Sequence, residues 1–310
     1  MARSPEYREI VIAGPTASGK TACAVAVAAA RNGEILSADS RQVYRLLDIG
    51  TGKDLAEYRA QGRPIPFHLI DIADVTEKYT LYRYCNDFNE AIITVRARGA
   101  LPVVCGGTGL YVEALLRGYK VSEVPEDEML RNALMAEPMD DLLMKLAQYP
   151  NLYNRCDKSS RKRVVRALEI AQHRGDGETE TRVPSVLKNP LVVIISPPAE
   201  TLRVRIAARL DARLESGMID EVRSLRESGV SDERLLMLGM EYAAILRYLN
   251  GSMGYPQMRE HLYNEICRLA KRQRTWFRGM QRRGVACHWL ESADHEAVLR
   301  LFDASQTGTG

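Results

Sequence analysis

The chain has 310 residues, of which 45% are apolar and 27% are charged, and its formal net charge is +3. This length holds a full α/β core and a smaller accessory unit, and this composition excludes a disordered chain. Because the net charge is small, any attraction to nucleic acid must come from local clusters of cations. The first residues carry no apolar signal core and no apolar run reaches membrane-spanning length, so we expect a cytoplasmic protein without a membrane partner.

The cysteines are scattered along the chain without any Cys-x-x-Cys pair, which argues against a zinc site. Several of them lie in apolar runs that are expected to be buried. Free thiols in a reducing compartment are the simplest interpretation. The six cysteines are Cys23, Cys85, Cys105, Cys156, Cys267 and Cys287.

The most informative stretch is a glycine-rich loop at residues 14–21, which follows a short apolar run and precedes an alanine-rich run. Strand, loop and helix in this order are typical of a phosphate-binding P-loop, whose backbone N–H groups surround an anion at a helix N-terminus. The alternative is a glycine turn entering an ordinary helix. We predict that the diphosphate or nucleotide is bound by Gly14, Pro15, Thr16, Ala17, Ser18, Gly19, Lys20 and Thr21.

A second strand is predicted at residues 34–37, and Asp39 follows it. The carboxyl ends of parallel strands face the ligand crevice, so Asp39 should emerge near the P-loop. An N-cap for the segment from residue 40 is an equally good interpretation of Asp39. Residues 50–53 form a second glycine turn with a cation, and residues 64–71 read as an extended segment in which His68 has a structural role.

Apolar residues at helical spacing predict a helix over residues 80–98 that packs against the sheet. A third strand at residues 101–105 runs into a glycine turn at residues 106–109, followed by a helix over residues 111–117. Glycines here let the backbone approach a ligand, and Thr108 is placed to bond a phosphate. The alternative is a tight turn whose glycines serve packing alone.

From residue 121 the character of the chain changes. Residues 121–187 show no convincing strand and carry helical patterns at residues 126–136, 139–148 and 159–173, with a polar loop at 174–179. The β-branched run at residues 191–195 then resumes the sheet. We therefore predict a discontinuous core at residues 1–120 and 188–293, a helical insertion domain at 121–187, and a tail at 294–310 that is frayed from residue 303.

The second half of the core is helical, with patterns over residues 201–216, 219–227, 240–249 and 258–280 and a short strand within 285–290. Arg205, Arg209 and Arg213 are spaced four apart and share one helix face. The last long helix is basic and contains Trp276 and Phe277, whose rings either stack on bases or, as is more common, pack in the core.

These observations predict an α/β fold with a P-loop NTPase-like parallel sheet flanked by helices. One crevice would collect the P-loop, Asp39 and Thr108, which suits group transfer to or from a di- or triphosphate held by Lys20 and Mg²⁺. A kinase using ATP would use the same loop. A non-catalytic RNA-binding protein would explain the basic helices and leave Asp39 without a role.

Seven motifs in this order closely resemble those of the tRNA dimethylallyltransferase family. They occupy residues 14–21, 37–44, 50–53, 68–71, 106–111, 163–169 and 271–277. The resemblance implies transfer of a dimethylallyl group from dimethylallyl diphosphate to the N6 amine of the adenosine beside the anticodon's 3′ side in tRNA. It also implies that the P-loop holds the donor's diphosphate.

The resemblance further implies individual roles. Asp39 would be the base, Arg205 the catalytic arginine with Arg209 a close second, and Thr108 a catalytic residue at the junction of tRNA and donor. The P-loop pattern itself indicates Thr21 as the ligand of Mg²⁺. The helical insertion would clamp the anticodon stem-loop, and the enzyme would act as a monomer. The implied tRNA contacts are Asp39, Ser40, Arg41, Gln42, Thr108, Arg163, Val164, Val165, Arg166, Ala167, Lys271 and Arg272.

Two departures from the family pattern are visible. Phe67 stands before His68 where many relatives have a second histidine, and residues 239–242 read Gly-Met-Glu-Tyr instead of the more frequent glycine-tyrosine-basic-glutamate order. The second departure puts the local tRNA contacts near Glu241 in doubt. No zinc finger follows the core, which favours a bacterial type of enzyme.

Overall fold

The computed structural model describes residues 7–122, 124, 126–174, 180–183 and 185–306. The chain divides into two compact units, Met1–Gly118 with Pro184–Gly310 and Tyr119–Val183. The sequence placed the inserted unit at residues 121–187. Residues 175–179 of the predicted loop and residues 307–310 of the predicted tail lie outside the described residues.

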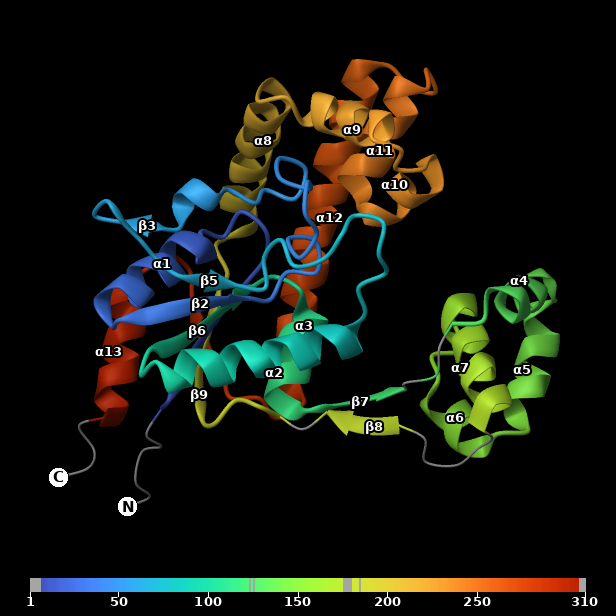
Figure 1. Ribbon diagram of the computed structural model, residues 1–310, viewed down its shortest axis with the longest axis horizontal. Coiled ribbons are helices and arrows are strands. Elements are labelled where there is room, and N and C mark those ends of the chain that lie inside the picture. The colour runs from blue at the N-terminus through green and yellow to red at the C-terminus, as the bar shows by residue number, and fades with distance from the viewer. Residues whose placement is uncertain (1–6, 123, 125, 175–179, 184, 307–310) are drawn as a thin grey trace. The chain divides into compact units, whose positions relative to one another are not determined.

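The larger unit is built on a six-stranded sheet in which all neighbouring strands are parallel (Figure 1). The central strands are runs of buried, mostly β-branched residues, as expected where helices cover both faces of a sheet. The strand order is β10 (His288–Leu290), β9 (Pro190–Ile195), β1 (Glu9–Ala13), β6 (Leu101–Gly106), β2 (Gly33–Ser37) and β5 (Phe67–His68). The predicted P-loop NTPase-like fold is confirmed.

Two helices cover one face of this sheet and two others lie on the opposite side. On the first face, α1 (Lys20–Ala30) packs on β1, β2 and β6, while α13 (His295–Gln306) packs on α1 and β9. On the other, α2 (Leu81–Ala97) contacts β2 and β6, and α3 (Gly109–Arg117) packs beside it.

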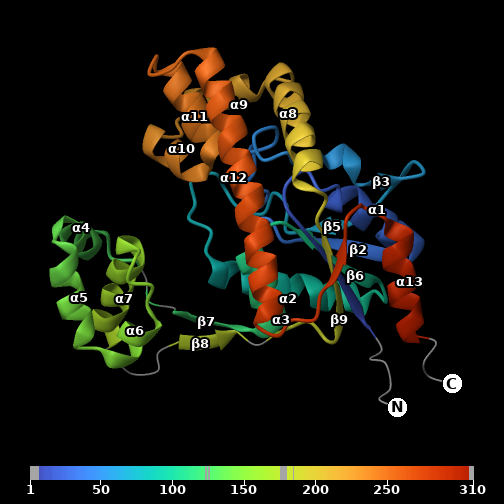
Figure 2. The ribbon, with the colours of Figure 1, turned by 180° about the vertical axis from the view of Figure 1, so that it is seen from behind.

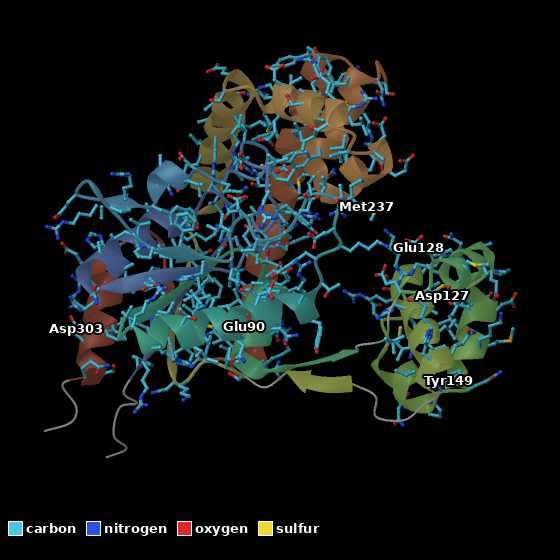
Figure 3. All side chains as sticks on the ribbon, in the orientation of Figure 1. Glu90, Asp127, Glu128, Tyr149, Met237 and Asp303 are labelled. Atoms are coloured by element: carbon cyan, nitrogen blue, oxygen red, sulfur yellow. The ribbon has the colours of Figure 1, made fainter. Side chains whose placement is uncertain are left out.

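The predicted tail is therefore largely wrong, because residues 295–306 form a helix that belongs to the sheet's apolar core. Val298 and Phe302 are buried there, and Asp303, labelled in Figure 3, pairs with Arg31 of the chain segment after α1. The amphipathic pattern of this segment supplies the apolar face that docks on the sheet layer.

A second apolar core lies among the helices that follow β9. It contains α8 (Ala199–Glu215), α9 (Met218–Glu227), α10 (Asp232–Leu238), α11 (Met240–Leu249) and α12 (Tyr255–Arg282). Helix α10 has only seven residues and was not predicted from the sequence. Figure 2 shows α12 running from these helices to α3, so this one long helix joins the second core to the sheet layer.

The inserted unit has its own apolar core, formed by α4 (Glu128–Ala136), α5 (Met139–Ala147), α6 (Pro150–Arg155) and α7 (Arg161–Arg174). The expectation that it lacks strands is wrong. β7 (Tyr119–Ser122) and β8 (Glu180–Val183) form an antiparallel pair at its two ends. Both strands have only four residues, too short for their alternation to be recognised in the sequence.

A short segment before α2 completes the larger unit. It contains the 3₁₀ turn Leu55–Glu57 and the two-residue strands β3 (Arg59–Ala60) and β4 (Arg63–Pro64), which pair antiparallel. Its extended continuation is β5, in which His68 Nε2 lies 2.6 Å from Glu34 Oε2 on β2. His68 thus has the structural role that the sequence indicated.

Candidate active site

The P-loop lies between β1 and α1, as predicted. Gly19 has a left-handed φ of 87° and leaves the N-terminus of α1 without a side-chain cap, so the first N–H groups of the helix stay available to an anion. Gly14 is equally constrained, because a Cβ there would stand 2.2 Å from the carbonyl oxygen of Ile195. The loop therefore has the backbone shape of a phosphate-binding site.

Lys20 begins α1 and turns back over the loop, where its Nζ donates to the carbonyl of Pro15 at 3.2 Å. Burial lowers the pKa of this ammonium, and the nearby Cys105 and Asp39 only partly oppose the shift. A desolvated cation attracts an anion strongly, because few waters compete for it. Lys20 is thus prepared for a phosphate oxygen.

Asp39 lies just beyond β2, and its Oδ1 accepts hydrogen bonds from the backbone N–H groups of Arg41 at 2.9 Å and Gln42 at 3.4 Å. The alternative role as a backbone cap is therefore confirmed in part, although residues 40–43 form a turn and not a helix. Oδ2 accepts no hydrogen bond from any residue that the structure describes. The bonds to Oδ1 orient the carboxylate, and Asp39 lines a pocket.

Thr108 joins the ends of β6 and β2, since its Oγ1 accepts from Ser40 N–H at 3.0 Å. Its own N–H donates to the carbonyl of Ala38 at 3.2 Å. Gly106 must be glycine, because a Cβ would lie 2.2 Å from that same carbonyl oxygen. Close packing explains this glycine, and Thr108 also lines the pocket, so its predicted role toward a phosphate stays a prediction that the geometry allows.

The arginines of α8 are placed differently from the prediction. Arg205 is exposed and does not line the pocket, and its Nη1 donates to the carbonyl of Ser18 at 3.5 Å. Arg209 and Arg213, one and two turns later, line the pocket. Burial, together with the charge of Arg209, lowers the pKa of Arg213 to about 10. The geometry favours Arg209, the second choice, over Arg205.

The turn at residues 50–53 supports these arginines. Gly52 has a φ of +64°, and its missing Cβ makes room for the guanidinium of Arg213, while its carbonyl accepts from Arg209 Nη2 at 3.2 Å. Gln42 Nε2 donates to the same carbonyl at 3.3 Å. The turn therefore holds one pocket arginine through its backbone.

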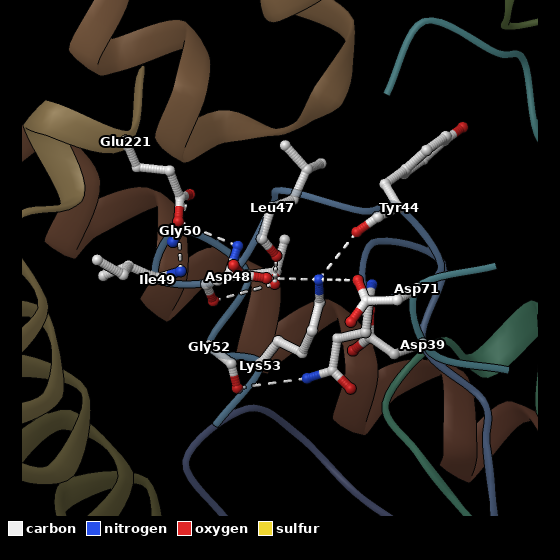
Figure 4. Close-up of polar contacts among 12 residues, drawn as sticks. Asp39, Tyr44, Leu47, Asp48, Ile49, Gly50, Gly52, Lys53, Asp71 and Glu221 are labelled. Atoms are coloured by element: carbon white, nitrogen blue, oxygen red, sulfur yellow. Dashed lines mark hydrogen bonds and ion pairs between the residues drawn. The ribbon is translucent and has the colours of Figure 1, made fainter. Parts of the chain in front are cut away.

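Lys53, the cation of this turn, has a fully buried side chain that stabilises the turn through its polar contacts (Figure 4). Its Nζ pairs with Asp48 at 2.7 Å, pairs with Asp71, and donates to the carbonyl of Tyr44 at 2.9 Å. The carboxylate of Glu221 accepts from the N–H groups of residues 48, 49 and 50. These bonds fix the turn from both sides.

Lys20, Asp39, Thr108, Arg209 and Arg213 line one cavity of about 510 Å³ at the carboxyl edge of the sheet. Since β1, β6 and β2 are parallel neighbours, the loops that follow them meet there. Arg213 and Gln273 also line the cavity, although the sequence indicated no site role for either of them. Glu241, near which tRNA contacts were in doubt, and Trp276, for which base stacking was one alternative, line it as well. The two aromatic residues of α12 lie in different surroundings. Phe277 is buried in the core, whereas Trp276 lines the pocket beside Gly109.

Glu241 is the acidic residue of the departure noted at residues 239–242, and it lines the same pocket. Burial raises the pKa of its carboxyl above the ordinary 4.5, although Arg213 and Arg41 oppose this shift. Its sequence signal was only that it replaced a more common basic residue. Because its pKa is still raised, Arg213 and Arg41 counter the burial of this acidic group only in part.

The predicted RNA contacts are only partly suitable. Ser40, Arg41, Gln42 and Arg272 line the pocket, and Lys271 is exposed on α12. In the inserted unit, however, Val164, Val165 and Ala167 are buried in its own core. Their side chains are unsuited to touching RNA, because the helical spacing that predicted α7 also turns these residues inward. Arg163 remains exposed, and Arg166 bonds Glu169 and the carbonyl of Val124.

A second cavity of about 510 Å³ lies between α8 and α12. Its apolar lining includes Leu202 and Ile206, and none of its lining residues, all within the described chain, is acidic. The Nε of Arg274 is buried without a partner among the described residues. The cations of this surface are Arg203, Arg268, Lys271, Arg274 and Arg278.

Comparison with known families decides the affiliation. The model of the family described as IPP transferase matches residues 42–280, which include Thr108, Arg209 and the basic part of α12. The chain belongs to the IPP transferase family. The model described as Isopentenyl transferase matches residues 8–63, which hold the P-loop and Asp39.

Individual relatives agree with this assignment along the whole chain. A protein of Syntrophus aciditrophicus named tRNA dimethylallyltransferase 1 is 46% identical over 290 residues, covering 93% of this chain and 95% of its own. One of Porphyromonas gingivalis named tRNA dimethylallyltransferase 2 is 45% identical over 302 residues, covering 96% and 99%. The crystal structure of a tRNA isopentenylpyrophosphate transferase from Bacillus halodurans matches with a TM-score of 0.68 at 30% identity, covering 97% and 98%.

Two further facts bear on this IPP transferase family member. All six cysteines are free thiols, and three of them are buried. None of the helices that the structure describes combines the length and apolar character needed to cross a bilayer.

Proposed function

We propose that this chain transfers a dimethylallyl group from dimethylallyl diphosphate to the N6 amine of the adenosine 3′-adjacent to the anticodon in tRNA, releasing diphosphate. The observation that carries the proposal is the convergence of Lys20, Asp39 and Arg209 on one pocket. The names of the relatives, tRNA dimethylallyltransferase, support the same chemistry.

The donor's diphosphate would lie on the P-loop, with Lys20 and the N-terminus of α1 facing its oxygens. As the allylic carbon–oxygen bond breaks, its electron pair stays on diphosphate, whose charge grows. Lys20, Arg209 and Arg213 would stabilise that charge more in the transition state than in the bound donor, and this difference lowers the barrier. The apolar dimethylallyl group would then point away from the cations.

The N6 amine attacks the allylic carbon, and the new carbon–nitrogen bond leaves a proton to be removed. The lone pair of the amine is delocalised into the adenine ring, so the amine is a weak nucleophile. Asp39 would accept this proton on Oδ2, while Oδ1 keeps its bonds to the turn. The base must leave its stack to reach the pocket, which costs a few kcal/mol and is easier in an anticodon loop than in a duplex.

Mg²⁺ is part of the proposal. Thr21 lines the pocket at the start of α1 and offers one hydroxyl. Among the described residues no group of three or more His, Cys, Asp or Glu side chains surrounds a metal-sized space. Mg²⁺ commonly keeps waters and substrate phosphate oxygens in its shell, so one protein ligand fits this mode. When bound, the ion would neutralise part of the diphosphate charge.

For RNA we propose binding through Ser40, Arg41 and Gln42 at the pocket, Arg163 and Arg166 in the inserted unit, and Lys271 and Arg272 on α12. The cation-lined surface between α8 and α12 would add sequence-independent attraction to the phosphate backbone. The role of the insertion as a clamp on the anticodon stem-loop, a monomeric state and a cytoplasmic location remain part of this proposal.

The test uses the purified full chain, labelled dimethylallyl diphosphate and an anticodon stem-loop. Label should pass to RNA containing adenosine at the target position and not to the matched RNA with inosine there, which lacks the amine. ATP in excess serves as a competing donor. Turnover of ATP, whether by phosphate release or by phosphoryl transfer to an acceptor, without any prenyl transfer would overturn the proposal.

A further inference from the structure

The side chain of Gln273 connects two of the loops that form the pocket. Its Oε1 accepts from the backbone N–H of Thr16 in the P-loop at 2.8 Å. Its Nε2 donates to the carbonyl of Gly107, after β6, at 2.9 Å. One amide from α12 therefore ties together loops that are more than ninety residues apart in the chain, and it does so inside the lining of the pocket.

Both ends of this amide are needed. Pro15 has no N–H, so Thr16 carries the first N–H of the loop after Gly14, and Gln273 holds it. Gly107 gives the amide its space, because a Cβ there would stand 2.6 Å from Nε2 and 3.5 Å from Lys20 Cε. A side chain must accept on one side and donate on the other, and glutamine does both.

The helix that carries Gln273 is firmly placed. Ala270 and Phe277, on neighbouring turns of α12, are both buried, and α12 packs on α3, α8 and α11. A side chain on such a helix has a fixed origin, so its amide sets a fixed separation between the two loops. The Lys20 ammonium lies within the same arrangement, held by the carbonyl of Pro15.

We propose that Gln273 is a positioning residue for the donor: it holds the P-loop and the Gly107 turn at the spacing in which Lys20 and the loop N–H groups fit a diphosphate. This inference rests on the proposed function, in which diphosphate is the group bound there. Gln273 stays bonded to the protein and touches the reacting atoms only through the loops. Its loss widens the site and weakens diphosphate binding without disturbing the fold.

Titration of the full-length protein with inorganic pyrophosphate and Mg²⁺ by calorimetry tests the inference. We expect Gln273→Ala to weaken pyrophosphate binding about ten-fold and to raise the KM for dimethylallyl diphosphate by a similar factor, while affinity for the stem-loop stays within about two-fold. Gln281→Ala is the matched control, since this glutamine lies on the same helix and bonds Trp289 away from the pocket. It should leave pyrophosphate binding unchanged.

Gln273→Glu separates positioning from general destabilisation. An ionised carboxylate accepts from Thr16 but repels the Gly107 carbonyl and the diphosphate, so binding should be weaker than in Gln273→Ala at pH 8. A protonated acid donates and accepts as the amide does. The affinity of Gln273→Glu relative to wild type should therefore recover as pH falls toward about 5, while the ratio for Gln273→Ala stays flat.

The outcomes are distinct. Equal pyrophosphate affinity of Gln273→Ala and wild type, or a Gln273→Glu ratio that does not change with pH, overturns the inference and leaves the proposed function intact. A wild-type protein that binds neither pyrophosphate nor the donor overturns both. Unchanged melting temperatures of the variants show that the comparison concerns folded protein.

Discussion

The hydroxyl of Thr108 is bonded to the backbone N–H of Ser40 at 3.0 Å, and this contact fixes the loop after β6 against the loop after β2. Asp39, the proposed base, immediately precedes Ser40. We predict that Thr108→Val lowers kcat about ten-fold, because a partly buried N–H loses its acceptor and the turn shifts. Thr108→Ser keeps the oxygen and should stay within about three-fold. Equal rates for the two variants would show that the hydroxyl does not position Asp39.

Asp39 combines a structural and a chemical role, and two substitutions separate them. Asparagine still accepts the N–H of Arg41 through Oδ1, so Asp39→Asn preserves the turn and removes only the base. We expect its rate of prenyl transfer to fall by roughly 10²–10⁴ while stem-loop affinity is unchanged. Asp39→Ala should also abolish labelling. A rate for Asp39→Asn within a few-fold of wild type would remove Asp39 from the mechanism.

The arginines of α8 give a direct comparison between sequence and structure. Arg209 lines the pocket and is bonded to Gly52, whereas Arg205 is exposed outside it. Arg209→Ala should lower kcat by about 10²-fold, the usual effect of removing one donor to a developing charge. Arg205→Ala should lower it less than about five-fold. If single-turnover rates rank the variants in the opposite order, the resemblance placed the arginine correctly.

Lys20 should favour binding of the donor and lower the folding stability of the ligand-free protein. Its pKa is lowered in the folded state, so at any pH below its ordinary value of 10.5 the unfolded chain binds this proton more readily, and folding is penalised. Lys20→Met removes the penalty. The ligand-free melting temperature of this variant should therefore exceed that of wild type at neutral pH, with a difference that shrinks as pH rises toward 10.5.

The same Lys20→Met protein tests the binding role. Pyrophosphate with Mg²⁺ should raise the melting temperature of wild type and leave that of the variant unchanged, since ligands stabilise only the state that binds them. A lower ligand-free melting temperature for Lys20→Met at neutral pH would contradict the penalty assigned to burial.

Two neighbours on α7 should respond in opposite ways. Val164 is fully buried in the inserted unit, and Val164→Ala should cost about 1–3 kcal/mol of stability through lost packing. Arg163 is exposed, and its one ion-pair partner among the described residues is Asp157 at 2.8 Å, so Arg163→Ala should change stability by less than about 1 kcal/mol. Arg163→Ala should instead weaken stem-loop binding and reduce its salt dependence. Denaturant unfolding and binding across a salt series measure both effects.

The local elements were predictable because each depends on residues that are close in sequence. The P-loop follows from glycines and a lysine at fixed spacing, and the sheet follows from buried β-branched runs. Elements with few residues, such as β7 and α10, gave no periodic signal long enough to read. The helix at residues 295–306 was missed because the burial of its apolar face depends on the distant sheet that it covers.

The glycine-rich loop, Asp39 and the ordered motifs were therefore determined by the sequence alone, since backbone conformation and strand ends follow from local residue types. Which side chains from distant segments share the pocket was decided only by tertiary packing. Helical spacing puts Arg205, Arg209 and Arg213 on one face of α8, yet only Arg209 and Arg213 of these three line the pocket. Gln273 is 257 residues from the Thr16 N–H that it holds, and nothing in local sequence relates them. The bond between Gln273 and Thr16 forms because α12 packs both in the second helical core and against α3 of the sheet layer.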